Sequence, residues 1–276
     1  KTNSRVAKTI KNDHIGGVIL FSQPIMNVKT GEMIRQRNIE NPKQVAALNQ
    51  SLQAYNTQTR QKQGLSRLPL VISIDEEGGE IDRLPATLGF INKTQIPQSF
   101  GALAKNNLPR AKKEAAAFAT LIAKELKSLH FNVNFAPVVD VNVNPTNPII
   151  GARGRSLSAN PKWVSAIALA QIKAYKANGI LPVIKHFPGH GSSTADSHLG
   201  LVDVTKTYQK QKELYPYREL IKKHFGGLIM TTHVINGQID RTQCRRGPKS
   251  DPQTWCPGTL SYQTLTKLLR KKLHYH

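Results

Sequence analysis

The residues best suited to chemistry lie in one polar segment between positions 185 and 198. It reads Lys-His-Phe-Pro-Gly-His-Gly from Lys185 and continues to Asp-Ser-His, which supplies Asp196 and His198. In an extended chain, side chains two positions apart point the same way, so the Asp196 carboxylate can hold an imidazole nitrogen of His198. A histidine held in this way can give and take a proton during bond cleavage. The segment predicts an acid/base dyad; the alternative is a solvated loop in which Asp196 caps a turn.

The three histidines of this segment, His186, His190 and His198, also allow a different interpretation. Imidazole is a common ligand of transition metals, so the three side chains are compatible with a metal site. The chain contains no HExxH pattern and no cysteine cluster. The metal interpretation is therefore the weaker one, and no cofactor is predicted.

A helix and a buried strand position this segment. Asn178-Gly179 is typical of a helix end with glycine in the left-handed position. The apolar run 180–184 then predicts a short strand. Lys185 and His186 should follow at the carboxyl rim of that strand, where α/β enzymes place their catalytic loops.

Other segments repeat this alternation of strand and helix. Apolar runs predict strands at 15–21, 68–74, 133–141 and 226–234. Helical patterns occupy 41–61, 110–129, 163–176, 206–224 and 264–272, and residues 22–40 are predicted to be an irregular loop. Strands that alternate with helices at such intervals indicate a parallel α/β architecture.

The ordered segment from Lys185 to His198 resembles the signature of family 3 glycoside hydrolases, specifically their bacterial β-N-acetylglucosaminidase branch. The resemblance implies an α/β fold of the (β/α)8 TIM-barrel type, with residues 1–276 forming a single N-terminal-type barrel domain. It also implies that His198, oriented by Asp196, acts as the acid/base group when N-acetylglucosamine (GlcNAc) is released. No metal or organic cofactor is implied.

The resemblance extends to residues that hold the sugar. Residues 75–83 are similar to the family's Asp-x-Glu-Gly-Gly-x-x-x-Arg segment, with Asp75 and Arg83 at the sugar-binding positions. Carboxylate and guanidinium groups suit paired hydroxyls. Glu80 departs from the family, which usually has arginine there. Lys185 and His186 of the signature are implied as further sugar contacts.

Three more positions match family patterns. Arg155 stands where the family has a sugar-binding arginine before Ser-Phe, although Leu157 replaces the phenylalanine and Arg153 competes for the role. Asp140 ends an Asn-x-x-Pro-x-x-Asp pattern, and His233 matches Met-x-x-His-Val. A turn-capping aspartate and a structural histidine are the alternatives for these last two.

The resemblance breaks at the end of the chain. The family continues into a strand ending in Ser-Asp-Asp, whose aspartate is the nucleophile, and no such motif occurs before His276. Five strands are recognisable, whereas a closed barrel has eight. We therefore expect a barrel domain truncated at its C-terminus, with the nucleophile beyond residue 276 and with first and last strands that cannot be recognised in the sequence.

These observations predict a retaining exo-β-N-acetylglucosaminidase that acts on peptidoglycan-derived or chitin-like saccharides. The alternative is a non-catalytic saccharide-binding or cell-wall-associated homologue that lacks the nucleophile. A β-glucosidase of the same family is disfavoured, because the Asp-Ser-His triplet belongs to the N-acetylglucosaminidase branch.

The net charge indicates which binding partners, other than a saccharide, are expected. It has 39 lysines and arginines against 17 aspartates and glutamates, a formal net charge of +22. This favours anionic polymers such as those of a cell envelope. The basic residues form no recognised nucleic-acid-reading motif, so no specific nucleic-acid partner is predicted. No apolar run is long enough to cross a bilayer, and no oligomeric state is predicted.

The two cysteines bear on the compartment. Cys244 and Cys256 have eleven residues between them, a spacing that suits a loop-closing disulfide, with two free thiols as the alternative. A disulfide favours an oxidising compartment. Together with the charge, it favours an exported, periplasmic or envelope-associated protein over a cytoplasmic one.

Overall fold

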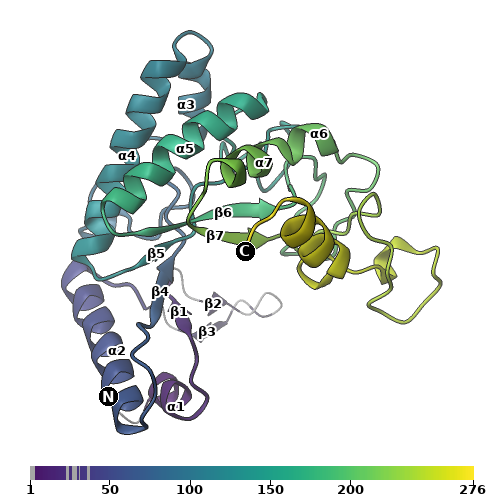
Figure 1. Cartoon of the computed structure of the whole chain (residues 1–276). Coiled ribbons are helices and arrows are strands. Elements are labelled where there is room, and N and C mark those ends of the chain that lie inside the picture. Colours follow the sequence, from purple (N-terminus) through teal and green to yellow (C-terminus); the bar gives the residue numbers. More distant parts are fainter. Residues whose placement is uncertain (1–3, 23–24, 27–29, 31, 36–37) are drawn as a thin grey trace.

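The computed structural model describes residues 4–22, 25–26, 30, 32–35 and 38–276. Its centre is a parallel five-stranded sheet in the order β1-β4-β5-β6-β7. The strands are β1 (Gly17–Ile19), β4 (Val71–Ile74), β5 (Val133–Asn134), β6 (Leu181–Phe187) and β7 (Leu228–Thr231). The sheet is curled, with helices along its outer side, so the described chain forms an incomplete barrel (Figure 1).

Eight helices surround this sheet in the described part of the chain, besides three short 3₁₀ turns. They are α1 (Arg5–Asn12), α2 (Pro42–Lys62), α3 (Pro97–Ala104), α4 (Leu108–Ser128), α5 (Pro161–Ala177), α6 (Lys210–Glu213), α7 (Tyr215–Lys222) and a π-helix (Gln263–Lys272). The 3₁₀ turns are Ala86–Leu88, Pro252–Thr254 and Gly258–Leu260.

Three of the long helices begin with the same N-terminal capping pattern. Asn41, Asn107 and Asn160 cap α2, α4 and α5, and each side chain accepts a hydrogen bond from a backbone N–H of the first turn. A proline follows within the first two helical positions of each. Asparagine satisfies an otherwise unpaired donor there, and proline has no N–H to leave unpaired. These helix starts are therefore encoded locally.

Small and apolar side chains let the helices approach the sheet closely. Ala115, Ala119 and Ile122 of α4 are completely buried, as are Ile72 and Ile184 of the strands. α4 packs against both α3 and α5. Close packing of this kind holds the strand ends, and hence the loops that follow them, in defined positions.

The predicted strands and helices are confirmed in most cases, and the first corrections concern one loop and one helix. Residues 22–40 are not wholly irregular, because β2 (Ile25–Met26) and β3 (Met33–Arg35) form an antiparallel pair. The predicted helix 206–224 is two helices, α6 and α7, with Pro216 in the first turn of α7. Proline cannot continue the hydrogen bonding of a preceding helix, so it begins a new one.

The predicted strand 133–141 is shorter than expected. Only Val133–Asn134 pairs regularly, although the Val139 N–H still donates to the Lys185 carbonyl at 2.9 Å. Pro137 has no N–H to offer the ladder, which explains the interruption. The segment remains alongside β6 and carries Asp140 to the carboxyl end of the sheet.

β6 is longer than predicted and includes Lys185 and His186. Successive side chains of a regular strand point to opposite faces. Here the pairing of β6 with β7 shifts register between Lys185 and Phe187. Such an irregularity re-aims side chains, and Lys185 and His186 both border the same cavity.

Cys244 and Cys256 are joined by a disulfide across the segment that precedes the last helix. Closing a loop of this length restricts the unfolded chain, so we expect Cys244→Ser to lower the free energy of unfolding by about 3 kcal/mol. Denaturant unfolding of the variant and of the wild type with and without reductant measures this. Two freely alkylated thiols in the native protein, detected by mass, would contradict the bridge.

Candidate active site

A cavity of about 650 Å³ opens at the carboxyl ends of the strands. Eight of the nine residues predicted to take part in catalysis or sugar binding line it: Asp75, Arg83, Arg155, Lys185, His186, Asp196, His198 and His233. Glu77, Arg153 and His190 line it as well. Residues up to 158 positions apart in the chain thus meet in one polar site, at the edge where parallel α/β proteins place their chemistry.

The predicted dyad is formed at the rim of this cavity. His198 Nδ1 lies 2.8 Å from Asp196 Oδ1, and the same oxygen accepts the His198 backbone N–H at 2.8 Å. Slight burial works against the ionised Asp196, but the hydrogen bonds from His198 outweigh it and hold the pKa of the carboxyl below its usual value. An ionised Asp196 favours the proton on Nδ1 and leaves Nε2 for proton transfer. The imidazole is 77% exposed, so a substrate can reach it.

A buried ionic cluster forms the floor of the cavity. Lys185 Nζ lies 2.6 Å from Asp75 Oδ1 and 2.6 Å from Glu77 Oε1. Arg155 makes two parallel hydrogen bonds to Glu77, Nε to Oε2 at 2.8 Å and Nη2 to Oε1 at 2.7 Å. Such bidentate geometry is strong and directional. Glu77 thus fixes the positions of both Lys185 and Arg155.

Glu77 is the member of this cluster that the sequence did not predict. Burial alone would favour its neutral form, but Lys185 and Arg155 more than offset this, and the pKa of Glu77 falls to about 2. It therefore stays ionised between two cations. In the sequence it stands at the glutamate of the Asp-x-Glu-Gly-Gly segment, a position to which no role was assigned because adjacent acids also suit a solvated turn.

Asp140 lies behind the cavity and does not line it. Its carboxylate is completely buried, with Oδ2 2.6 Å from His186 Nδ1 and Oδ1 accepting the His190 backbone N–H at 2.8 Å. The structure therefore shows Asp140 fixing the signature loop, in place of the direct sugar contact expected from the sequence. Burial lowers the pKa of His186 to about 4 despite the neighbouring carboxylate, so its ring is neutral near pH 7.

Two arginines and His233 complete the rim. The Arg83 guanidinium lies 5.9 Å from the centre of the Phe21 ring, and its buried Nε has no hydrogen-bond partner within the described residues. Arg153 lies 3.9 Å from Glu80, the acid that replaces the family's arginine. His233 Nδ1 lies 3.1 Å from the Thr259 hydroxyl.

The histidines of the loop are engaged with protein groups. His190 contacts Ser193 Oγ through Nδ1 at 2.7 Å and Ser197 Oγ through Nε2 at 2.9 Å. Across the residues that the structure describes, no group of three or more histidine, cysteine, aspartate or glutamate side chains is placed to hold a metal ion.

Taken together, the curled parallel sheet and its ion-rich cavity define an α/β-barrel type of protein with a site at the carboxyl ends of its strands. The chain belongs to the family described as glycosyl hydrolase family 3 N terminal domain, which it matches over residues 1–276.

Individual relatives agree with this assignment. Beta-hexosaminidase A of Pseudoalteromonas piscicida is 38% identical over 98% of this chain and 41% of its own length. The beta-hexosaminidase of Shewanella frigidimarina is 34% identical over 84% of this chain and 59% of its own length. The chain thus spans only part of the length of these curated relatives.

Solved structures show the same fold. A glycoside hydrolase family 3 beta-N-acetylglucosaminidase from Paenibacillus sp. str. FPU-7 superposes with a TM-score of 0.74 at 31% identity, covering 97% of this chain and 43% of that one. NagZ from Neisseria gonorrhoeae, in complex with N-trifluoroacetyl-D-glucosamine, has a TM-score of 0.76 at 26% identity, covering 99% of this chain and 68% of that one.

Proposed function

We propose that the protein to which this chain belongs is a retaining exo-β-N-acetylglucosaminidase. The observation that carries the proposal is the hydrogen-bonded pair of Asp196 and His198 beside a cavity of sugar size. The names of the relatives, beta-hexosaminidase and beta-N-acetylglucosaminidase, support the same activity.

In the proposed reaction, His198 donates a proton to the glycosidic oxygen and later removes one from the attacking water. Asp196 stabilises the imidazolium that is present before the first transfer and again after the second, and His198 is neutral in between. Retention also requires a nucleophilic carboxylate, which the proposal does not assign to a described residue.

The cavity floor supports binding of a hydroxyl-rich ring. Lys185 and Asp75 offer a donor and an acceptor from one ion pair, and the side chain of Arg83, which lines the cavity, offers further donors. His186 is held by Asp140 with its ring at the cavity. Terminal GlcNAc of peptidoglycan-derived or chitin-like saccharides is the proposed substrate, with Asp75, Arg83, Arg155, Lys185, His186 and His233 around the sugar.

The stereochemistry of the product tests this mechanism. The protein should release GlcNAc from chitobiose as the β-anomer first, because two successive displacements restore the configuration. Proton NMR of the anomeric signals during the first minutes distinguishes the anomers before they equilibrate. First release of the α-anomer would reject the retaining mechanism, and no release of GlcNAc would reject the glycosidase.

One observation favours a second candidate, a non-catalytic saccharide-binding protein. Every carboxylate that lines the cavity within the described residues is engaged: Asp75 and Glu77 with Lys185, and Asp196 with His198. A chain without another carboxylate would bind GlcNAc and leave its glycosides intact. Binding of GlcNAc measured by calorimetry, without any release from chitobiose, would support this candidate.

We also propose an exported, periplasmic or envelope-associated location, with the cytoplasm as the alternative. The Cys244–Cys256 disulfide and the net charge of +22 support it, because disulfides persist in oxidising compartments and cations attract anionic envelope polymers. Within the described residues, no helix combines the length and apolar character needed to cross a membrane.

A further inference from the structure

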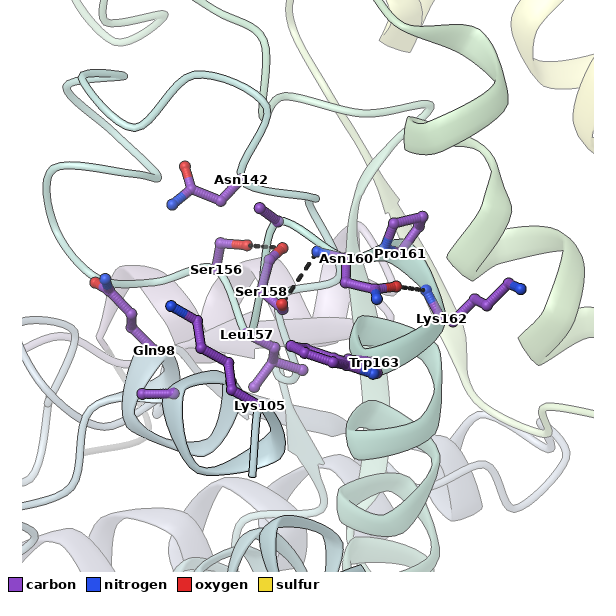
Figure 2. Close-up of a pocket in the computed structure, with 13 residues that line it drawn as sticks. Gln98, Lys105, Asn142, Ser156, Leu157, Ser158, Asn160, Pro161, Lys162 and Trp163 are labelled. Atoms are coloured by element: carbon purple, nitrogen blue, oxygen red, sulfur yellow. Dashed lines mark hydrogen bonds between the residues drawn. The ribbon is translucent and has the colours of Figure 1, made fainter. Parts of the chain in front are cut away.

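A second cavity, of about 700 Å³, lies between α3, residues 156–160 and the first turn of α5 (Figure 2). It shares a wall with the candidate active site. Ser156 and Leu157 line the second cavity, whereas Arg153 and Arg155, only a few positions earlier, line the first. The segment 153–158 therefore separates two hollows, and the proposed glycosidase chemistry uses only one of them.

Trp163 provides an aromatic surface in this second cavity. It is partly buried and packs against the hydrophobic core, while the rest of the side chain borders the cavity. Figure 2 shows the indole beside Leu157 and the stem of Lys105. A rigid aromatic ring that is half packed and half open suits stacking against the apolar face of a sugar ring.

Polar side chains line other parts of the cavity. They are those of Gln98, Asn142 and Ser158. The Ser158 hydroxyl accepts the Asn160 backbone N–H at 3.0 Å. Amides and hydroxyls around an aromatic ring are the groups that bind sugar hydroxyls and fix their orientation.

The charge of the cavity is positive. Lys105 and Lys162 are among its lining residues, and no aspartate or glutamate is. In Figure 2 the Lys105 amine extends to the side of the cavity that carries Gln98, whereas the Lys162 amine points away. No ion pair joins Lys105 to a carboxylate of the described chain. Lys105 is exposed to solvent, which screens its charge, but a cation that borders a cavity without acids still favours an anionic ligand.

We propose that this second cavity binds an acidic saccharide, with a pyranose ring against Trp163 and its carboxylate on Lys105. The inference goes beyond the proposed glycosidase, because it concerns a different cavity and needs neither the Asp196–His198 dyad nor a nucleophile. Binding here would hold an acidic glycan next to the active site across the shared wall.

Titration with matched sugar pairs, followed by tryptophan fluorescence, tests the proposal. The probes are N-acetylmuramic acid against GlcNAc and glucuronic acid against glucose, so that each acid has a neutral partner. Both acids should change the emission at millimolar concentrations and bind more tightly than their partners. If only one of the two acids binds, the cavity accepts a carboxylate only at that acid's position on the ring, and the proposal holds for that kind of acidic sugar. If neither changes the emission, the proposal is wrong.

The two tryptophans of the chain supply a matched control. Trp163→Phe should abolish the change in emission, whereas Trp255→Phe should retain it, because Trp255 packs against Arg241 elsewhere. By calorimetry, Trp163→Ala should weaken binding of N-acetylmuramic acid about tenfold. Lys105→Gln should remove the preference for the acid over GlcNAc and leave the weak neutral binding. Unchanged preference in Lys105→Gln would overturn the assignment of the carboxylate.

Hydrolysis separates this inference from the proposed function. Trp163→Ala should cleave p-nitrophenyl GlcNAc at the wild-type rate, and His198→Ala should bind N-acetylmuramic acid in the second cavity as the wild type does. If Trp163→Ala lost both hydrolysis of p-nitrophenyl GlcNAc and binding of N-acetylmuramic acid, the two cavities would act as one site, and a separate binding site would be rejected.

Discussion

Replacing His198 by alanine should lower kcat/KM for hydrolysis of chitobiose roughly 10²–10⁴-fold, which is the usual contribution of a positioned acid/base group. His198 carries this effect because Asp196 orients its Nδ1 at 2.8 Å and leaves the other ring nitrogen for the substrate. The loss should be smaller for p-nitrophenyl GlcNAc in the first displacement, because p-nitrophenolate departs without a proton. Steady-state rates on both substrates measure the difference.

Two further variants make this test specific. Asp196→Asn keeps a hydrogen-bond acceptor near Nδ1 but removes the charge, so its loss of activity should lie between the wild type and His198→Ala. His224→Asn is the matched control, because His224 is an exposed histidine outside the cavity, and asparagine tolerates its positive φ of 54°. Wild-type turnover of chitobiose by His198→Ala would remove the acid/base assignment.

Replacing Glu77 by glutamine should lower the free energy of unfolding by about 3–5 kcal/mol, the usual effect of removing one partner from a buried ion pair. The side chain of Glu77 is 1% exposed, and it faces Lys185 at 2.6 Å and Arg155 at 2.7 Å. Without the carboxylate, these two cations remain buried close together. The melting temperature should fall by roughly 10 °C. Denaturant and thermal unfolding measure both quantities.

Glu80 supplies the control for this variant. It lies three positions along the same segment, but its side chain is 61% exposed and 3.9 Å from Arg153. Glu80→Gln should therefore change the free energy of unfolding by less than about 1 kcal/mol. Equal stability of the Glu77 and Glu80 variants would show that the cluster does not depend on Glu77.

The same carboxylate predicts a pH dependence. The pKa of Glu77 is lowered from an ordinary 4.5 to about 2, so the unfolded chain binds its proton more readily than the folded one. The stabilisation is complete above about pH 4.5 and is lost as the pH falls towards 2. The stability difference between wild type and Glu77→Gln should therefore shrink over this range and remain constant above it.

Residues that act on their close sequence neighbours were predictable. Asp196 and His198 lie two positions apart, and the expected pair is present at 2.8 Å. The start of α2 was equally clear, because Asn41 and Pro42 satisfy the first turn by themselves. In both cases only a few residues separate the interacting groups, so the local backbone conformation is enough to bring them together.

Residues whose role depends on distant partners were not predictable. From the sequence, Glu77 resembled part of an acidic turn. The two cations that it binds, Lys185 and Arg155, lie on other segments, and Arg155 is 78 positions away. Asp140 looked like a sugar contact until His186, 46 positions away, proved to occupy its carboxylate. The re-aiming of Lys185 and His186 depends on a register shift against β7, which only strand pairing creates.

The sequence by itself thus determined the family, the strand and helix alternation, and the contact between Asp196 and His198, because each depends on spacing over a few residues. Only the tertiary structure decided which charged groups neutralise one another, which side chains face the cavity, and that a second cavity with Trp163 lies behind the shared wall. The physical reason is that ion pairs and hydrogen bonds depend on the distance between two side chains in space. For residues on neighbouring strands, the register of the strands sets that distance.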